Sequence, residues 1–167
     1  HCDGATTADI TPEIHRARTH YVGHMEAIKP ALTVEEHLEF WARAKGYKQP
    51  AGNILQALDL ESLADVPGRF LSAGQKRRLS LTRLLATPAT LWLLDEPSVP
   101  LDGQSAARLE DMLAAHRATG GMAIVATHTE IALPGAESID MAEYGIAIET
   151  LVRTPETAVG ERDYGEW

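Results

Sequence analysis

Two short apolar runs, each followed by polar residues, most constrain how this chain folds. The first covers residues 91–94 and is followed at once by Asp95 and Glu96. The second begins at Met122 and ends just before His128. Continuous apolar runs of this length are typical of parallel strands covered on both faces, and we expect a right-handed helical crossover to join them. Because functional groups gather at the carboxyl ends of such strands, the three polar residues are candidate site residues.

Helix signals surround these runs. A T-x-x-E capping box at residues 33–36 predicts a helix that ends at Gly46. An S-x-x-Q box at residues 72–75 predicts a second helix that stops before Pro88. Apolar residues at helical spacing over 109–116 predict the crossover helix between the two strands.

The expected fold class is therefore α/β, with a parallel sheet and an inserted helical region. A length of 167 residues suits one domain, which we place at residues 1–150. Within it we expect a helical subdomain over 33–85 and a strand-bearing core over 86–135. A last strand is expected within 141–151. The polar segment 151–167 contains glycine and proline and is predicted to be a mobile tail.

Composition excludes several classes of function. The formal net charge of -9 argues against a nucleic-acid partner. No apolar run approaches the roughly 20 residues that span a bilayer, so we expect any membrane contact to be made through a partner. The single cysteine, Cys2, cannot form an internal disulfide and fits a reducing compartment.

The carboxylates after the first run suit phosphate chemistry. Asp95 at a strand tip can hold Mg²⁺ beside substrate phosphates. Glu96, one residue further on, suits the orientation of an attacking water. Taken alone, the pair is equally typical of a solvated loop start. His128 has two interpretations as well, as a structural histidine or as a contact to a terminal phosphate.

Three consecutive cations, Lys76, Arg77 and Arg78, lie in the first turn of the helix that begins after Ser72. Cations at this end oppose the helix macrodipole. A bound anion would remove the conflict, since free N–H groups at a helix N-terminus bind phosphate. The alternative is that the three cations pair with surface carboxylates, of which this acidic chain has many.

Four motifs in this order resemble the P-loop NTPases of the ATP-binding-cassette (ABC) family. Residues 71–75 (LSAGQ) resemble the signature motif, and residues 91–96 resemble the Walker B strand with its catalytic glutamate. Residues 98–102 fall where the D-loop lies, and 127–128 where the switch histidine lies. The resemblance extends over residues 18–135.

This resemblance implies a role for each matched residue. Asp95 would serve Mg²⁺, Glu96 would activate water for ATP hydrolysis, and His128 would contact the γ-phosphate. Other residues would serve the ATP of an opposing subunit or the dimer interface. These are Ser72, Ala73, Gly74 and Gln75 in the signature motif, and Ser98 and Asp102 in the D-loop.

Within the family, the chain resembles the ATP-binding subunits of haem exporters in cytochrome c biogenesis. Residues 21–24 (YVGH), 29–38 (KPALTVEEHL) and 71–79 (LSAGQKRRL) carry this likeness. It implies a homodimer that joins integral-membrane transporter subunits of the cytochrome c maturation type. Such subunits lie peripherally at the cytoplasmic face of the bacterial inner membrane.

The chain departs from the family pattern at its phosphate-binding elements. It contains no G-x-x-x-x-G-K-[ST] loop. We expect this loop, and the strand that leads into it, to precede His1. Without that strand, we expect an apolar edge of the sheet to be exposed. Met25 stands where a glutamine is expected, with Glu26 as the adjacent substitute.

Two alternatives stay open. One is a non-hydrolytic remnant that acts as a binding or regulatory module, and the other is an ABC ATPase outside transport.

Overall fold

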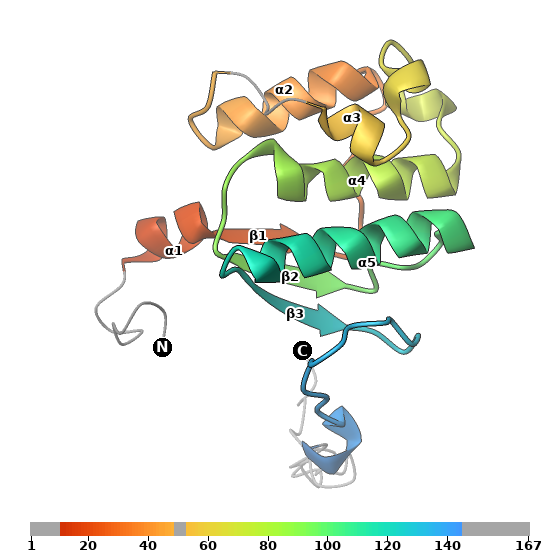
Figure 1. Ribbon diagram of the computed structural model, residues 1–167. Coiled ribbons are helices and arrows are strands. Elements are labelled where there is room, and N and C mark those ends of the chain that lie inside the picture. The colour runs from red at the N-terminus through yellow and green to blue at the C-terminus, as the bar shows by residue number, and fades with distance from the viewer. Residues whose placement is uncertain (1–10, 49–52, 145–167) are drawn as a thin grey trace, which may run out of the picture. The chain divides into compact units, whose positions relative to one another are not determined.

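A parallel three-stranded sheet forms the base of the structure. The computed structural model describes residues 11–48 and 53–144. The strands are β1 (Thr19–Val22), β2 (Leu91–Asp95) and β3 (Met122–Ala126), in the order β1-β2-β3. All three arrows point the same way in Figure 1. The predicted α/β class is confirmed.

Helices cover one face of this sheet (Figure 1). Helix α4 contacts β1, α5 contacts β3, and α2 and α3 pack against α4. Helix α5 joins β2 to β3, as expected for a crossover. The described α-helices are α1 (Pro12–Arg18), α2 (Val34–Ala44), α3 (Ile54–Ala57), α4 (Ala73–Ala86) and α5 (Gly103–Ala118). The 3₁₀ turns are η1 (Glu61–Leu63), η2 (Gly68–Phe70) and η3 (Met141–Tyr144).

Both predicted capping boxes form. The Thr33 hydroxyl accepts the Glu36 N–H at 3.2 Å, and the Glu36 carboxylate accepts the Thr33 N–H at 2.8 Å. Ser72 and Gln75 repeat the arrangement at 3.2 and 2.8 Å. These reciprocal bonds satisfy donors that a helix start leaves free. They place the starts of α2 and α4 where the sequence predicts them.

The sheet is covered on one face by the described helices, and the expectation of two covered faces is wrong for this part of the chain. Val22, Trp92 and Leu94 are almost fully buried beneath the helices. The alternate side chains point the other way, and Tyr21 and Ile124 there are 57% and 62% exposed. Side chains alternate between faces along a strand, so one layer of helices buries half of each apolar run.

Strand β3 is an edge strand among the described residues, since it pairs with β2 alone. Its side chains alternate between exposed and half-buried, so the prediction that this strand is buried is wrong here, whereas the exposed apolar edge expected from the sequence is present. Met122 is 42% exposed there. An edge strand presents unpaired backbone groups to its surroundings.

The chain divides into two compact units, 1–134 and 135–167. In the second unit, the described residues hold the 3₁₀ turn Met141–Tyr144, so the strand expected within 141–151 does not begin there. The rest of that expected strand and the predicted tail at 151–167 lie outside the described residues. No helix in the described part of the chain is long and apolar enough to cross a bilayer.

We predict that Thr33→Ala lowers the free energy of unfolding by about 1 kcal/mol, because it removes the N-cap of α2. Thr33→Ser is the matched control, since it keeps the hydroxyl and should stay close to the wild type. Urea denaturation followed by circular dichroism measures both. Equal losses in the two variants would contradict the cap as the cause.

Candidate functional site

The carboxyl ends of β2 and β3 bring the predicted site residues together. Asp95 is the last residue of β2, and its partner in the register of the sheet is Ala126, the last residue of β3. Glu96 follows in the left-handed region, with a φ of 47°, and its N–H donates to the Ala126 carbonyl at 2.8 Å. A non-glycine residue seldom adopts this conformation, and such strain is concentrated at functional sites. The backbone turn directs Glu96 toward the end of β3.

Glu96 contacts His128 at this edge. The Nδ1 of His128 lies 2.8 Å from Oε1 of Glu96, and the His128 backbone N–H donates to the same oxygen at 3.0 Å. The Thr127 hydroxyl donates to Oε2 at 3.2 Å. These hydrogen bonds, the one from the His128 side chain above all, lower the pKa of Glu96. The site therefore holds an ionised carboxylate that is 23% exposed.

Arg77 of α4 ties the loops behind this edge together. It is 2% exposed, and its guanidinium donates to four backbone carbonyls. Nη1 donates to Gly23 at 2.8 Å, Nη2 to Asp95 at 2.8 Å and to Glu96 at 2.7 Å, and Nε to Pro97 at 3.2 Å. Arginine offers five N–H donors in a rigid plane, which suits several carbonyls converging from different loops. One side chain thus fixes the helix of the signature motif to the ends of β1 and β2.

The interpretation that the three cations in the first turn of α4 bind an anion is wrong for two of them. Arg77 binds carbonyls, and Arg78 pairs with the Asp59 carboxylate at 2.8 Å. Lys76 makes no hydrogen bond or ion pair with the described residues. The sequence held a signal for Arg77, because it lies four residues before Leu81 and therefore on the same buried side of α4.

The signature residues lie against the D-loop segment. Ser72 and Gln75 cap α4, and a Cβ at Gly74 would lie 3.4 Å from the Pro100 carbonyl, so the helix start and residues 98–102 are neighbours. The Ser98 hydroxyl is buried and has no hydrogen-bond partner among the described residues. Asp102, the last residue of this segment, caps α5 by accepting the Ser105 N–H at 2.8 Å.

The segment after β1 carries the position where the sequence departs from the family pattern. Met25 is 85% exposed. Glu26 is partly buried, and this burial raises the pKa of its carboxyl, against the opposing effect of the Arg77 and Lys76 charges. Glu26 thus lies within electrostatic reach of the guanidinium that holds the Walker B end.

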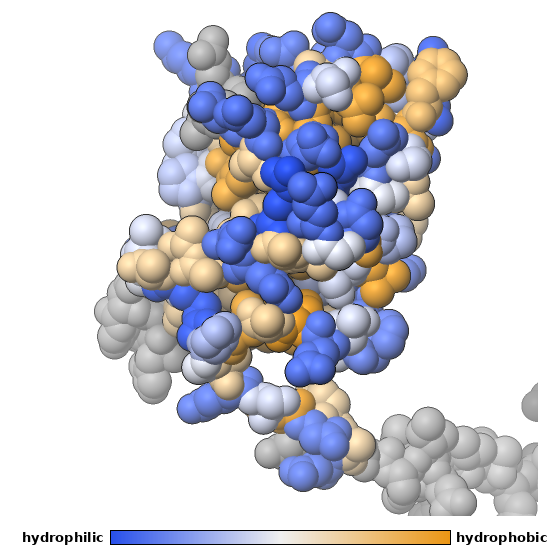
Figure 2. Space-filling view, turned by 45° about the vertical axis from the view of Figure 1, so that its right-hand side comes forward, coloured by the Kyte–Doolittle hydropathy of each residue, from blue (hydrophilic) through white to orange (hydrophobic). Residues whose placement is uncertain are grey.

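Figure 2 turns the right-hand side of Figure 1, where the three arrowheads lie, toward the viewer. Strongly hydrophilic side chains gather in the middle of that view, between hydrophobic ones nearer its margins.

The oxygen ligands available at the carboxyl ends of the strands, with Asp95 at the tip of β2, suit Mg²⁺. This ion takes one or two protein carboxylates and completes its shell with phosphates and water. No group of three or more His, Cys, Asp or Glu within the described ranges could hold a metal without such help.

A sequence profile described as "ABC transporter" matches residues 1–99 of the chain. The chain belongs to the ABC transporter family. Two curated relatives are the cytochrome c biogenesis ATP-binding export protein CcmA of Paramagnetospirillum magneticum and its counterpart in Rhodospirillum rubrum. They are 50% and 54% identical to this ABC protein over 143 and 134 residues. These matches cover 83% and 80% of the chain.

The ABC chain spans 66% and 58% of the length of those two relatives. It is also similar to a solved structure of the ATP-binding subunit of an ABC transporter. That similarity has a TM-score of 0.64 and 25% identity, and covers 75% of this chain and 54% of the other. A dimeric ATP-binding cassette with ADP and phosphate matches in fold, with a TM-score of 0.63 and 24% identity, over 76% of this chain and 61% of the other.

We predict that Arg77→Met lowers the free energy of unfolding by about 3 kcal/mol or more, because each buried carbonyl left without a donor costs about 1–3 kcal/mol. Lys76→Met is the matched control on the neighbouring residue and should stay within about 0.5 kcal/mol of the wild type. Urea denaturation measures both. A loss for Arg77→Met no larger than the control's would show that the four hydrogen bonds contribute little.

We predict that His128→Ala raises the pKa of the Glu96 carboxyl toward its ordinary range, because the largest interaction that lowers it is lost. The change is measured by following the ¹³C signal of the Glu96 carboxyl as the pH is lowered. The exposed histidine variant His24→Ala serves as the control and should leave the titration unchanged. An unchanged Glu96 titration in His128→Ala would disprove the contact.

Proposed function

We propose that this chain belongs to the ATP-binding and ATP-hydrolysing subunit of a membrane ABC transporter. The observation that carries the proposal is the ionised Glu96 carboxylate held by His128 at the carboxyl edge of the sheet. A fixed carboxylate at such an edge can orient water for attack on a phosphate. The backbone at Glu96 is itself held by Arg77 from the signature helix.

Each site residue takes a defined part in this reaction. Glu96 accepts a hydrogen bond from the attacking water and polarises it. His128 can exchange its hydrogen bond to Glu96 for one to the terminal phosphate, which links the carboxylate to the presence of nucleotide. Asp95 is the side chain that would hold a magnesium ion, and such an ion neutralises phosphate charge when bound.

In this proposal, ATP hydrolysis requires two copies of the subunit. Ser72, Ala73, Gly74 and Gln75 would contact the ATP held by the opposing copy, with Ser98 and Asp102 at the interface between copies. The proximity of Gly74 to Pro100 supports this grouping, because it places the signature helix beside the D-loop segment. The cassette similar in fold is described as dimeric.

The transporter that we propose serves haem export in cytochrome c biogenesis. The relatives named as cytochrome c biogenesis ATP-binding export proteins support this assignment. The membrane partners would be integral subunits of the cytochrome c maturation type. The ATPase subunit would lie peripherally at the cytoplasmic face of the bacterial inner membrane, without a nucleic-acid partner.

ATP turnover by Glu96→Gln tests the proposal, in the longest form of the protein that its native gene encodes. We expect turnover to fall at least a hundredfold while ATP binding persists, because the amide keeps the shape of the side chain but cannot act as a base. Glu39→Gln is the matched control, since Glu39 pairs with Arg43 on the exposed face of α2. It should hydrolyse ATP like the wild type.

Equal turnover in Glu96→Gln and the wild type would remove Glu96 from the mechanism. Binding of ATP without turnover in the wild type would favour the alternative, a non-hydrolytic binding or regulatory module. The exposed Met25 in place of a glutamine is the feature that favours this second candidate function.

A further inference from the structure

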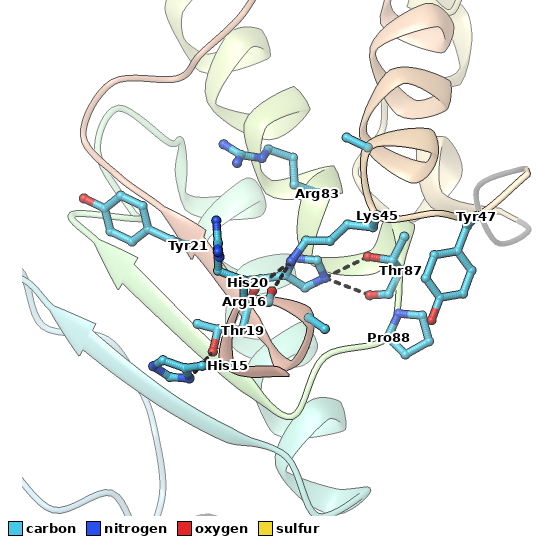
Figure 3. Close-up of a pocket in the computed structure, with 12 residues that line it drawn as sticks. His15, Arg16, Thr19, His20, Tyr21, Lys45, Tyr47, Arg83, Thr87 and Pro88 are labelled. Atoms are coloured by element: carbon cyan, nitrogen blue, oxygen red, sulfur yellow. Dashed lines mark hydrogen bonds between the residues drawn. The ribbon is translucent and has the colours of Figure 1, made fainter. Parts of the chain in front are cut away.

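A cavity of about 660 Å³ lies beside the start of β1 (Figure 3). Its walls come from the end of α1, the start of β1, the end of α2 and the segment that joins α4 to β2. These walls lie at the amino ends of β1 and β2, whereas Glu96 follows the carboxyl end of β2. The cavity is therefore separate from the proposed hydrolytic site, and its size is typical of small-molecule sites.

The lining of this cavity is basic in a chain that is acidic overall. The sequence holds 24 Asp and Glu against 15 Lys and Arg, yet none of the described residues that line the cavity is Asp or Glu. Of the lining cations, Arg16 has a carboxylate partner outside the lining, Glu13, at 3.2 Å. The basic and histidine residues around the cavity are His15, Arg16, His20, Lys45 and Arg83.

Arg83 has a charge that no described residue balances. Its guanidinium lies over the Trp41 ring, 5.4 Å from the ring centre, and makes no hydrogen bond or ion pair with the described residues. Burial lowers the pKa of Arg83 without any carboxylate to oppose the shift. Arginine nevertheless keeps its proton in proteins. A partly buried cation thus faces the cavity with its donors free.

Lys45 adds a second cation. Its ammonium donates to the Arg16 carbonyl at 2.6 Å and to the Thr19 carbonyl at 3.0 Å, which leaves one of its three N–H donors for a ligand. Burial lowers the pKa of Lys45, and the charge of Arg83 lowers it further. These two cations repel each other, and an anion bound between them would remove that cost.

We propose that this cavity binds an organic anion, with a phosphate or carboxylate group at Arg83 and Lys45 and an apolar body against Tyr47. Figure 3 shows Lys45 between Arg83 and Tyr47. A guanidinium matches the paired oxygens of both head groups. The half-exposed ring of Tyr47 supplies an apolar surface for the remainder of the ligand.

Isothermal titration calorimetry on the full chain, without ATP, tests this site with phenyl phosphate and with benzoate as probes. We expect at least one probe to bind, and its affinity to fall at least tenfold in Arg83→Gln and in Lys45→Gln. Arg43→Gln, on the exposed side of α2 and outside the cavity, is the matched control and should bind like the wild type. The probe that binds more tightly identifies the preferred head group.

Absence of binding by both probes would overturn the proposal, and so would unchanged affinity in Arg83→Gln. Inorganic phosphate that binds as tightly as phenyl phosphate would overturn the apolar part of the assignment. Circular dichroism checks that each variant folds. If Arg83→Gln does not fold, Arg83→Lys keeps the charge but loses the paired donors, and it should still bind at least threefold more weakly. Binding here is independent of hydrolysis at Glu96.

Discussion

The guanidinium of Arg77 is the interaction on which the rest of the structure depends. Its four hydrogen bonds reach Gly23 after β1 and Asp95, Glu96 and Pro97 at the end of β2. Three of these carbonyls belong to loops that leave the sheet, and the fourth belongs to Asp95, the last residue of β2. Buried carbonyls at such positions need a hydrogen-bond donor from outside the strands. Burial disfavours the charge of Arg77, and the charges of Glu26, Asp95 and Glu96 favour it. The helical region and the sheet are thus joined by a bonded cation as well as by apolar packing.

The same interaction explains why the candidate site can hold a strained conformation. Glu96 has a positive φ, which a residue other than glycine adopts at a cost of order 1–3 kcal/mol. Arg77 holds its carbonyl, Ala126 accepts its N–H, and His128 and Thr127 hold its carboxylate. Contacts from α4 and from the end of β3 therefore fix both the backbone and the side chain. These contacts hold the carboxylate at the sheet edge.

The two ends of the sheet differ in charge. At the carboxyl ends, Asp95 and Glu96 form a negative site that is partly offset by Arg77. At the amino ends, Arg83 and Lys45 line a cavity to which none of the described residues brings an acid. Arg83 lies on α4, and Lys45 directly follows α2, which packs against α4. The helical region therefore provides both Arg77 at the proposed hydrolytic edge and the two cations of the cavity at the amino ends of the strands.

The sequence by itself determined the local elements, because their signals are local. Reciprocal bonds within three residues fix the starts of α2 and α4, and the apolar runs fix β2 and β3. It also placed Glu96 and His128 at one edge, since parallel strands end together. It could not decide which faces of the sheet are covered, because that depends on layers far apart in the chain. The spacing of Arg77 and Leu81 marked Arg77 as the cation on the buried side of α4, but only the packing of α4 decides that it binds backbone carbonyls while Arg78 pairs with Asp59.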